Sequence, residues 1–280
     1  MSERVNVTTP LRQRKAVKVS DFNVKISGDN NLCYISDILI VKGTKLIVVD
    51  RSNNKLKLFG QDHKYQDSIT FEDFPWCACC LSDSDVAVTI PREKTIQIVD
   101  IKDQMRKVRA IKTEFQCWGI AVMNDQILIT TCGDGHNVII LDRNGSKIRD
   151  FRPDSYESNK LLFPWYIKVD MANSSIYISY DTNDRFAAFS TDWNMRYIYT
   201  NQNLKTASGI DTDREGNIYQ CGYRSHCIQQ ISKEGKFIKT LIPTTEFKTY
   251  PIVIRLYRDT DSFFVTYRYS DIVEVYNLRV

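Results

Sequence analysis

A pattern of alternating apolar and polar residues recurs along almost the whole chain. Each unit of the pattern contains four short apolar runs that are separated by polar turns. Alternation with a period of two is typical of β-strands that bury one face, so each unit predicts four consecutive strands. Six such units follow one another, and the last contains only three runs.

The units begin at nearly constant intervals. Their first runs open at Tyr34, Trp76, Trp118, Trp165, Ser208 and Tyr250, which are 42, 42, 47, 43 and 42 residues apart. A fixed period of this length with four strands per unit is typical of the blades of a β-propeller. The sequence therefore predicts an all-β fold: a six-bladed β-propeller of four-stranded antiparallel blades, forming a single domain over residues 16–280.

The last unit lacks its fourth strand, because the sequence stops at Val280 after the third. The strand-like segment AVKVSDFNVKI, residues 16–26, precedes the first unit and has no other partner. We expect this N-terminal strand to complete the last blade, since closure of the ring removes an open blade edge. Residues 1–15 are expected to form a flexible N-terminal arm.

The composition agrees with a folded domain and limits the classes of partner. Hydrophobic residues make up 42% of the chain and charged residues 26%, while the net charge is only +4. This charge is too small to indicate a dedicated nucleic-acid-binding protein. The apolar runs are far shorter than the roughly 20 residues that span a bilayer, and the first residues contain no apolar signal segment. We therefore expect a cytoplasmic, monomeric propeller that does not bind membranes.

Eight cysteines are present, at positions 33, 77, 79, 80, 117, 132, 221 and 227. Alternation along a strand sends Cys77 and Cys79 to one face and Cys80 to the other, which does not suit a zinc site. Free cysteine is readily buried as a small apolar residue. We therefore predict reduced, buried thiols and no metal site.

The fifth unit carries the most specific motif in the chain. It reads SGIDTDREGNIYQCGYRSHCIQQISKEGKFIKTL, and the first and third units repeat parts of it. This unit resembles the NHL repeat through Gly209, Gly216, Asn217, Ile218, Tyr219, His226, Ile228, Ile231 and Gly235. The Gly-His and Trp-Asp pairs of the WD40 repeat do not recur. The chain is thus similar to the C-terminal propeller of TRIM-NHL ubiquitin ligases.

The resemblance implies a propeller that recruits a partner. That partner would be a protein substrate or, as the alternative, a single-stranded or structured RNA. Ligase chemistry in that family belongs to an upstream RING domain, and this chain contains no cysteine and histidine spacing of that type. We therefore predict a non-catalytic recognition module without a cofactor, whose full-length protein could be an E3 ubiquitin ligase.

The partner is expected to bind the face that carries the hairpins between second and third strands and the connections between blades. We call this the upper face. Positive and aromatic side chains gather in its loops from the fifth, sixth and first units. The predicted binding residues are Arg51, Lys55, Lys205, Tyr223, Arg224, Lys248, Tyr250, Tyr267 and Arg268. Such a set suits an acidic protein segment as well as RNA phosphates.

Two further features of this face leave alternatives open. Trp76, Trp118 and Trp165 share one position in their units, so they either form an aromatic collar at the channel mouth or pack between blades. The connection from Pro153 to Trp165 is longer than its counterparts, and long loops on a rigid scaffold often carry specificity. It is a second candidate contact.

The enzyme alternative is a calcium-dependent lactonase-like hydrolase, because propellers of that class hold a metal in the channel. Calcium prefers six to eight oxygen ligands. The inner strands offer only Asp37, Asp170, Asp211 and Asp213, at positions that do not correspond between units. The three histidines lie near no obvious nucleophile, so no catalytic residue is predicted.

Overall fold

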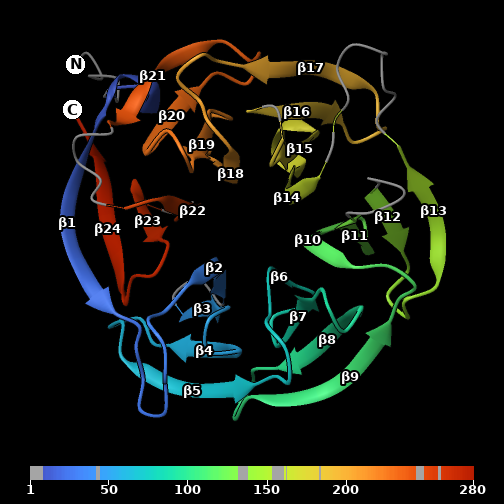
Figure 1. Ribbon diagram of the computed structural model, residues 1–280. Coiled ribbons are helices and arrows are strands. Elements are labelled where there is room, and N and C mark those ends of the chain that lie inside the picture. Colours follow the sequence, from blue (N-terminus) through green and yellow to red (C-terminus); the bar gives the residue numbers. More distant parts are fainter. Residues whose placement is uncertain are drawn as a thin grey trace, which may run out of the picture.

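The computed structural model contains six four-stranded antiparallel sheets, arranged as blades around a central axis (Figure 1). It describes residues 9–41, 45–131, 138–152, 161, 163–182, 184–243, 249–257 and 260–280. In the first five blades the strands follow chain order from the axis outward. The predicted six-bladed propeller is confirmed.

The elements are named by their place in the blades. The inner strands are β2 (Ile35–Val41), β6 (Ala78–Cys80), β10 (Cys117–Met123), β14 (Pro164–Asp170), β18 (Ala207–Thr212) and β22 (Pro251–Leu256). The second strands are β3 (Lys45–Asp50), β7 (Asp85–Ile90), β11 (Gln126–Thr131), β15 (Ser175–Tyr180), β19 (Ile218–Gly222) and β23 (Ser262–Tyr267). The third strands are β4 (Lys55–Phe59), β8 (Thr95–Asp100), β12 (Val138–Leu141), β16 (Arg185–Ser190), β20 (Cys227–Ile231) and β24 (Ile272–Arg279). The outer strands are β5 (Tyr65–Thr70), β9 (Arg106–Lys112), β13 (Lys147–Phe151), β17 (Met195–Thr200), β21 (Phe237–Ile242) and β1 (Lys15–Asn23). Two short 3-10 helices, η1 (Leu11–Gln13) and η2 (Met171–Asn173), complete the described elements.

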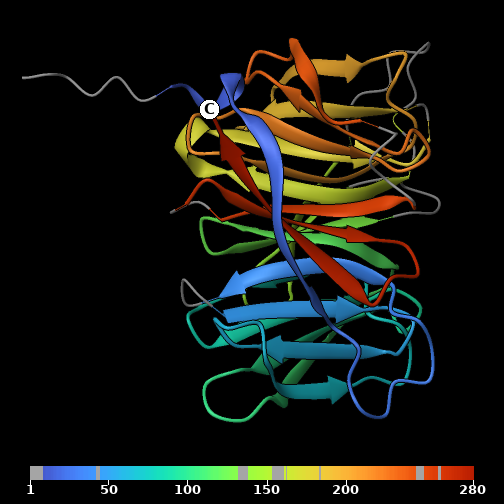
Figure 2. The ribbon, with the colours of Figure 1, turned by 90° about the vertical axis from the view of Figure 1, so that its left-hand side faces the viewer.

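The N-terminal strand closes the ring, as the sequence predicts. β1 pairs antiparallel with β24, from Lys15 opposite Arg279 to Asn23 opposite Ile272. Beyond the strand, the Val24 N–H donates to the Asp271 carbonyl at 2.8 Å. Figure 2 shows the two strands side by side at the edge of the last blade. The sixth blade is therefore built from both ends of the chain.

The described part of the predicted arm, residues 9–14, packs against the fifth and sixth blades. Leu11 is buried in a cluster with Leu256 and Leu278. Its backbone N–H lies 3.1 Å from the Glu215 carboxylate, and Arg14 forms an ion pair with Asp261. Apolar burial and charge thus attach these residues to the junction between the two blades.

The hydrophobic core lies between neighbouring blades, because the second and third strands bury side chains on both faces. Val49 of β3 and Leu56 of β4, for example, share a cluster with Val88 of β7 in the next blade. The outer strands are largely exposed. No helix among the described residues is long and apolar enough to cross a membrane.

The cysteines mostly follow the prediction of buried thiols. Cys33, Cys77, Cys79, Cys117, Cys221 and Cys227 are buried and unpaired. Cys80 is exposed, because it points to the opposite face of its strand from Cys79. Cys132 lies outside the described residues.

Two glycines of the NHL-like unit have clear physical roles. Gly216 adopts φ +85° in the β18–β19 hairpin, a conformation that favours glycine. Gly209 lies in β18, where a Cβ atom would stand 2.6 Å from the Ile252 carbonyl of β22. Gly119 of β10 is in the same situation, 2.7 Å from the Trp165 carbonyl. Glycine therefore allows adjacent inner strands to approach closely.

Deletion of residues 16–26 should destabilise or oligomerise the protein, because β24 would lose its partner and expose an open edge. Thermal melting and light scattering after size exclusion measure both effects. A chain that begins at residue 9 keeps β1 and serves as the control. A monomeric deletion variant with an unchanged melting temperature would contradict the closure of the ring by β1.

Candidate binding site at the channel mouth

Three tryptophans from different blades meet at the upper mouth of the channel. The ring centroids of Trp76 and Trp118 are 5.1 Å apart, those of Trp76 and Trp165 5.3 Å, and those of Trp118 and Trp165 6.2 Å. Trp76 belongs to the second blade and Trp165 to the fourth, so the contact is not confined to neighbouring blades. The tryptophans thus form the collar at the mouth, which was one of the two alternatives.

The collar is dense and contains unused hydrogen-bond donors. Trp76 is buried, whereas Trp118 and Trp165 are half-buried. The buried Nε1 atoms of Trp76 and Trp118 meet no acceptor among the described residues. A buried donor without a partner is costly. A ligand oxygen that reached this cluster would satisfy it.

Arg51 covers one side of the collar. Its guanidinium group lies 4.6 Å from the centroid of the Phe74 ring, 5.1 Å from that of Tyr34 and 5.2 Å from that of Trp76. Contacts of this kind are attractive because the face of an aromatic ring carries negative charge. Arg92 lies on the same Phe74 ring at 5.1 Å.

A second arginine extends the aromatic surface over the sixth and fifth blades. The Arg268 guanidinium lies 4.7 Å from the Tyr269 ring and 5.8 Å from the Tyr223 ring, and it donates a hydrogen bond to the Tyr223 hydroxyl. Tyr223 stacks on Tyr250 at 4.8 Å, and His226 lies 4.4 Å from the Tyr250 ring.

Tyr269 joins the two halves. Its ring centroid lies 5.7 Å from that of Tyr34, and the Arg268 guanidinium lies over the same ring at 4.7 Å. Tyr269 is 54% exposed and has φ +52°. A positive φ also occurs at Lys94 and His226, in the hairpins between second and third strands of other blades, so it is a feature of these turns.

These side chains form one continuous surface, which we call the aromatic–arginine belt. It consists of Tyr34, Arg51, Phe74, Trp76, Arg92, Trp118, Trp165, Tyr223, His226, Tyr250, Arg268 and Tyr269.

Four of the predicted binding residues lie in the belt: Arg51, Tyr223, Tyr250 and Arg268. Two others lie near it on the upper face. Arg224 is exposed, and Lys205 forms an ion pair with Asp184 at 3.0 Å.

The remaining predicted residues lie elsewhere or outside the described chain. The Lys55 ammonium bonds to Asp29 at 2.7 Å and to the Gly28 carbonyl at 2.8 Å, so it holds a loop. Tyr267 is buried, and its hydroxyl bonds to Glu274. Lys248 lies outside the described residues, as does most of the connection between Pro153 and Trp165.

Five belt residues besides the tryptophans are absent from the predicted set: Tyr34, Phe74, Arg92, His226 and Tyr269. His226 and Tyr269 lie in loops of the fifth and sixth units, where the prediction placed the site. The position of Tyr34 at the start of a unit is the one sequence signal that indicates the channel mouth. Phe74 and Arg92 carry no such signal, because only the fold brings their loops together.

A hydrogen bond crosses the channel below the collar. The Tyr166 hydroxyl donates to the Ser36 carbonyl at 3.0 Å, which joins the fourth blade to the first. This contact lies directly beneath the belt and connects opposite sides of the ring.

An ion network lies further along the inner strands, with buried carboxylates and partly exposed cations. Arg255 pairs with Asp37 at 2.5 Å, and Lys168 pairs with Asp211 at 2.5 Å. Arg255 also approaches Asp211 at 3.9 Å, so it links the two pairs. Burial raises the pKa of Asp37 despite the arginine. Burial acts on Asp211 in the same direction, but Lys168 and Arg255 outweigh it and lower the pKa. Two cations thus balance these two carboxylates.

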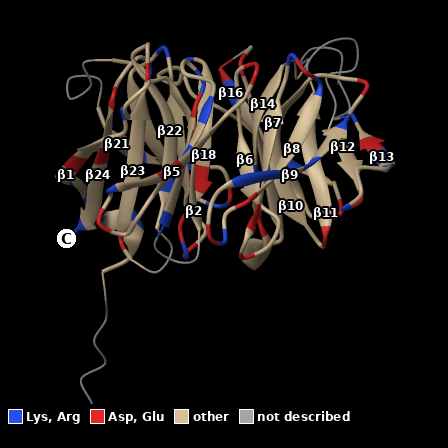
Figure 3. Cartoon of the chain, turned by 90° about the horizontal axis from the view of Figure 1, so that it is seen from below, with Lys and Arg blue, Asp and Glu red and all other residues tan. Residues whose placement is uncertain are grey.

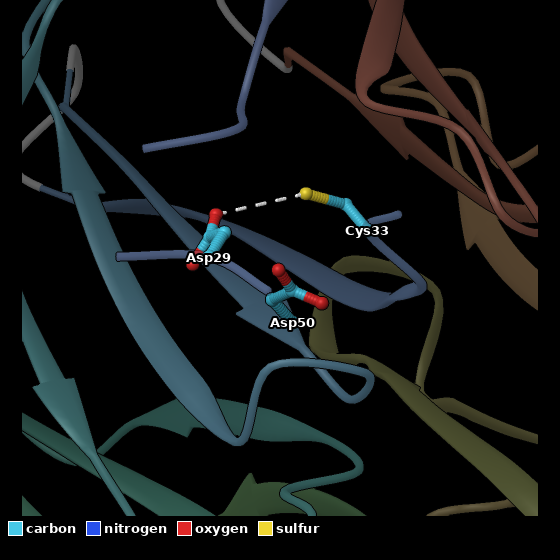
Figure 4. A group of neighbouring side chains, drawn as sticks. All are labelled: Asp29, Cys33 and Asp50. Atoms are coloured by element: carbon cyan, nitrogen blue, oxygen red, sulfur yellow. Dashed lines mark hydrogen bonds between the residues drawn. The ribbon is translucent and has the colours of Figure 1, made fainter. Parts of the chain in front are cut away.

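One group of side chains elsewhere resembles a metal site. Asp29, Cys33 and Asp50 point toward one another in the first blade (Figure 4). The buried Lys57 ammonium, however, lies 2.6 Å from both carboxylates. Burial alone would lower the pKa of Lys57, but the two carboxylates raise it. The lysine therefore takes the place that a cation would need.

The comparisons with known proteins show the fold. No family model and no curated protein matches the chain, so the NHL resemblance stays a prediction. Among solved structures, a catalytically inactive virginiamycin B lyase from Staphylococcus aureus with quinupristin matches with a TM-score of 0.67 and 12% identity, over 92% of this chain and 99% of that one. A streptogramin B lyase gives a TM-score of 0.69 and 15% identity over 93% and 88% of the two chains. The β-propeller domain of Myceliophteria thermophila Cps50 (Swd1) gives 0.65 and 12% over 87% and 83%.

The prediction that this chain is not an enzyme is contradicted by these comparisons. Lyases share its architecture over nearly the whole chain. The absence of a familiar triad or metal pattern from the sequence therefore does not separate a binding propeller from a catalytic one.

Calcium and EDTA should leave the melting temperature unchanged, because the channel carboxylates Asp37 and Asp211 are already paired with cations. Differential scanning fluorimetry with each additive measures this. A calcium-dependent rise of several degrees would contradict it and favour a metal-dependent hydrolase.

The Lys57→Met substitution should lower the free energy of unfolding by about 3–5 kcal/mol, because it leaves Asp29 and Asp50 buried without their shared cation. Lys55→Met is the matched control and should cost less, since Lys57 still compensates Asp29. Urea unfolding measures both. The difference in free energy of unfolding between Lys57→Met and the wild-type chain should shrink as the pH falls toward 4, because the uncompensated carboxylates can then take up protons. Equal stability of the two variants would show that Lys57 is not the central cation.

Proposed function

We propose that this chain recruits a protein partner, which binds to the aromatic–arginine belt on the upper face. One observation carries the proposal. Arg51 and Arg268 lie against aromatic rings, and within the described chain neither forms an ion pair with a carboxylate. Both guanidinium groups therefore keep hydrogen-bonding capacity for a ligand.

The composition of the belt suits a protein segment that carries carboxylates beside apolar side chains. Tryptophan, tyrosine and arginine are the residue types enriched at the energetic centres of protein interfaces. Arginine binds carboxylates with two parallel hydrogen bonds. The half-buried rings of Trp118 and Trp165 offer apolar area next to Arg51. An acidic segment with an apolar or aromatic residue would use both features.

Protein is favoured over RNA because many of the cations near the belt are already paired. Lys205 pairs with Asp184 at 3.0 Å, and Arg92 of the belt pairs with Asp73 at 3.9 Å. RNA binding through phosphates depends on clustered, uncompensated positive charge. Stacking of bases on the tyrosines would add to binding only where the strand is already held.

The resemblance to NHL repeats supports a finer proposal. In a TRIM-NHL-like ubiquitin ligase, the propeller brings the substrate to a RING domain. By this analogy, the partner of the belt would be the substrate of a ligase in the cytoplasm. The analogy rests on the motif in the fifth unit, of which Gly209 and Gly216 have the structural roles described above.

Replacement of both Arg51 and Arg268 by Ala should reduce protein capture from a lysate at least tenfold, because both guanidinium groups that lack a carboxylate partner in the described chain are lost. Lys64→Ala with Lys236→Ala removes two exposed cations from lower-face hairpins and is the matched control. Quantitative mass spectrometry of the captured proteins, with and without nuclease, gives the measurement. Nuclease treatment should leave the amount of captured protein unchanged. Loss of capture after nuclease would replace the protein partner by RNA, and equal loss in the control would exclude the belt.

The comparison with lyases favours a second candidate, in which a small molecule occupies the same mouth and is turned over there. His226 lies in the belt, 4.4 Å from the Tyr250 ring. An imidazole can accept or donate a proton in such a reaction. Quinupristin, present in one of the similar lyase structures, is a suitable first probe.

If the second candidate holds, incubation with quinupristin should give a product of altered chromatographic retention or mass, and His226→Ala should abolish it. Liquid chromatography with mass spectrometry follows the reaction, and His63→Ala is the control. An unaltered probe would reject quinupristin as a substrate. Turnover that persists in His226→Ala would exclude His226 from the chemistry.

A further inference from the structure

The outer strand β9 differs from the five other outer strands, although all six occupy equivalent places at the rim. Its sequence, RKVRAIK, contains four cations and no acid, whereas none of the others has more than two cations. Figure 3 shows Lys and Arg along β9 at the side of the molecule. Six of its seven residues are exposed.

Most of this charge has no carboxylate partner among the described residues. Arg106 is the exception, because it bonds to Asp100 at 2.7 and 2.9 Å. Lys107, Arg109 and Lys112 contact only neutral groups: an aromatic ring, a backbone carbonyl and a hydroxyl, respectively. The strand thus presents three uncompensated positive charges, and Val108 is 57% exposed between them.

One edge of β9 pairs with β8, and the other edge has no partner strand among the described residues. The hydrogen bonds between β8 and β9 show which backbone groups point toward this open edge. Beyond the end of β9, the Thr113 N–H donates to the Lys94 carbonyl across the pair of strands at 2.9 Å. In an antiparallel ladder, residues alternate between facing the partner strand and facing away. Ala110 and Lys112 lie three residues and one residue before Thr113, so both have the opposite orientation to it. Their backbone N–H and C=O groups therefore point away from β8.

The first blade provides a direct comparison. There the Phe71 N–H donates to the Asn54 carbonyl, just as the Thr113 N–H donates to the Lys94 carbonyl. Ser68 of β5 and Ala110 of β9 each lie three residues before these donors, so the two residues correspond. The outward N–H of Ser68 is taken by the carboxylate of Asp67 at 2.7 Å. That of Ala110 meets no acceptor within the described chain. The edge of β5 is thus blocked by its own acid, and the edge of β9 is open.

We propose that β9 is a docking edge for an extended acidic segment of a partner protein, which adds a fifth strand to the second blade. The open backbone groups would supply the ladder hydrogen bonds, and the cations would select acidic side chains. Basic residues on an edge strand ordinarily oppose pairing with other strands. Here the same positive charges favour pairing with a strand that carries acidic side chains. This surface is separate from the belt and does not depend on the proposed function.

Charge also distinguishes this occupant from two others. A second copy of the chain, paired through β9, would place cation opposite cation, which is unfavourable. A nucleic acid would use the cations but not the backbone edge. Only an acidic strand uses both.

The test measures fluorescence anisotropy with a fluorescein-labelled decapeptide of alternating Glu and Val. Ala110→Pro removes the outward N–H but no bond of the existing ladder, and it should weaken binding at least tenfold. Ser68→Pro makes the equivalent change in β5 and should leave binding unchanged. Lys107→Glu with Arg109→Glu should also weaken it at least tenfold. Thermal melting verifies that each variant is folded.

A peptide that is N-methylated at alternate residues provides a second measurement, independent of whether Ala110→Pro folds. Methylation of the residues that face β9 should abolish binding, and methylation of the other set should not. The proposal is overturned if both peptides bind equally, or if a Lys–Val peptide binds as well as the Glu–Val one. It is also overturned if single-stranded RNA binds more tightly and is unaffected by Ala110→Pro, or if the protein dimerises through β9.

Discussion

The ring of blades depends on how the N-terminal segment is fastened at two points. The pairing of β1 with β24 completes the last blade. Lys57 then holds the segment that leads from β1 into the first blade, through the Val24 carbonyl at 2.9 Å and the Asp29 carboxylate at 2.6 Å. One buried ammonium group therefore joins the closing segment to Asp50 at the end of β3. A lysine is expensive to bury, and two carboxylates with a carbonyl offset that cost.

The belt at the channel mouth is a consequence of this closure. Its members come from every blade, so their ring contacts exist only if the circle is complete. Tyr34 of the first blade touches Tyr269 of the sixth, across the seam where the two ends of the chain meet. Beneath the belt, the Tyr166 hydroxyl joins the opposite fourth and first blades, and Arg255 links the sixth blade to the first and the fifth. Closure of the ring, the contacts among the inner strands and the site at the mouth are thus linked features.

Much of the fold could be predicted from the sequence because a period of 42 residues and alternation are local signals. The closing strand followed from counting runs. The site was harder, because alternation assigns a side chain to a face but not to a neighbour. Lys55 and Tyr267 therefore appeared to be surface residues, although one bonds to Asp29 and the other is buried. Phe74 and Arg92 belong to the belt only because the fold brings their two loops into contact. The prediction of a non-catalytic protein was wrong for another reason. Lyases share this fold, so the lack of a familiar catalytic motif in the sequence does not exclude an enzyme.

The central claim is that a protein partner contacts the belt, and site-specific photo-crosslinking tests it most directly. A benzophenone amino acid at position 269, where the native tyrosine is 54% exposed, would lie in the belt. The same group at position 65 replaces a tyrosine that is 48% exposed on β5 and serves as the control. If the belt binds a protein, position 269 should give a discrete, nuclease-resistant protein adduct and position 65 should give none. An adduct that forms only from position 65, or one from position 269 that nuclease removes, would contradict it.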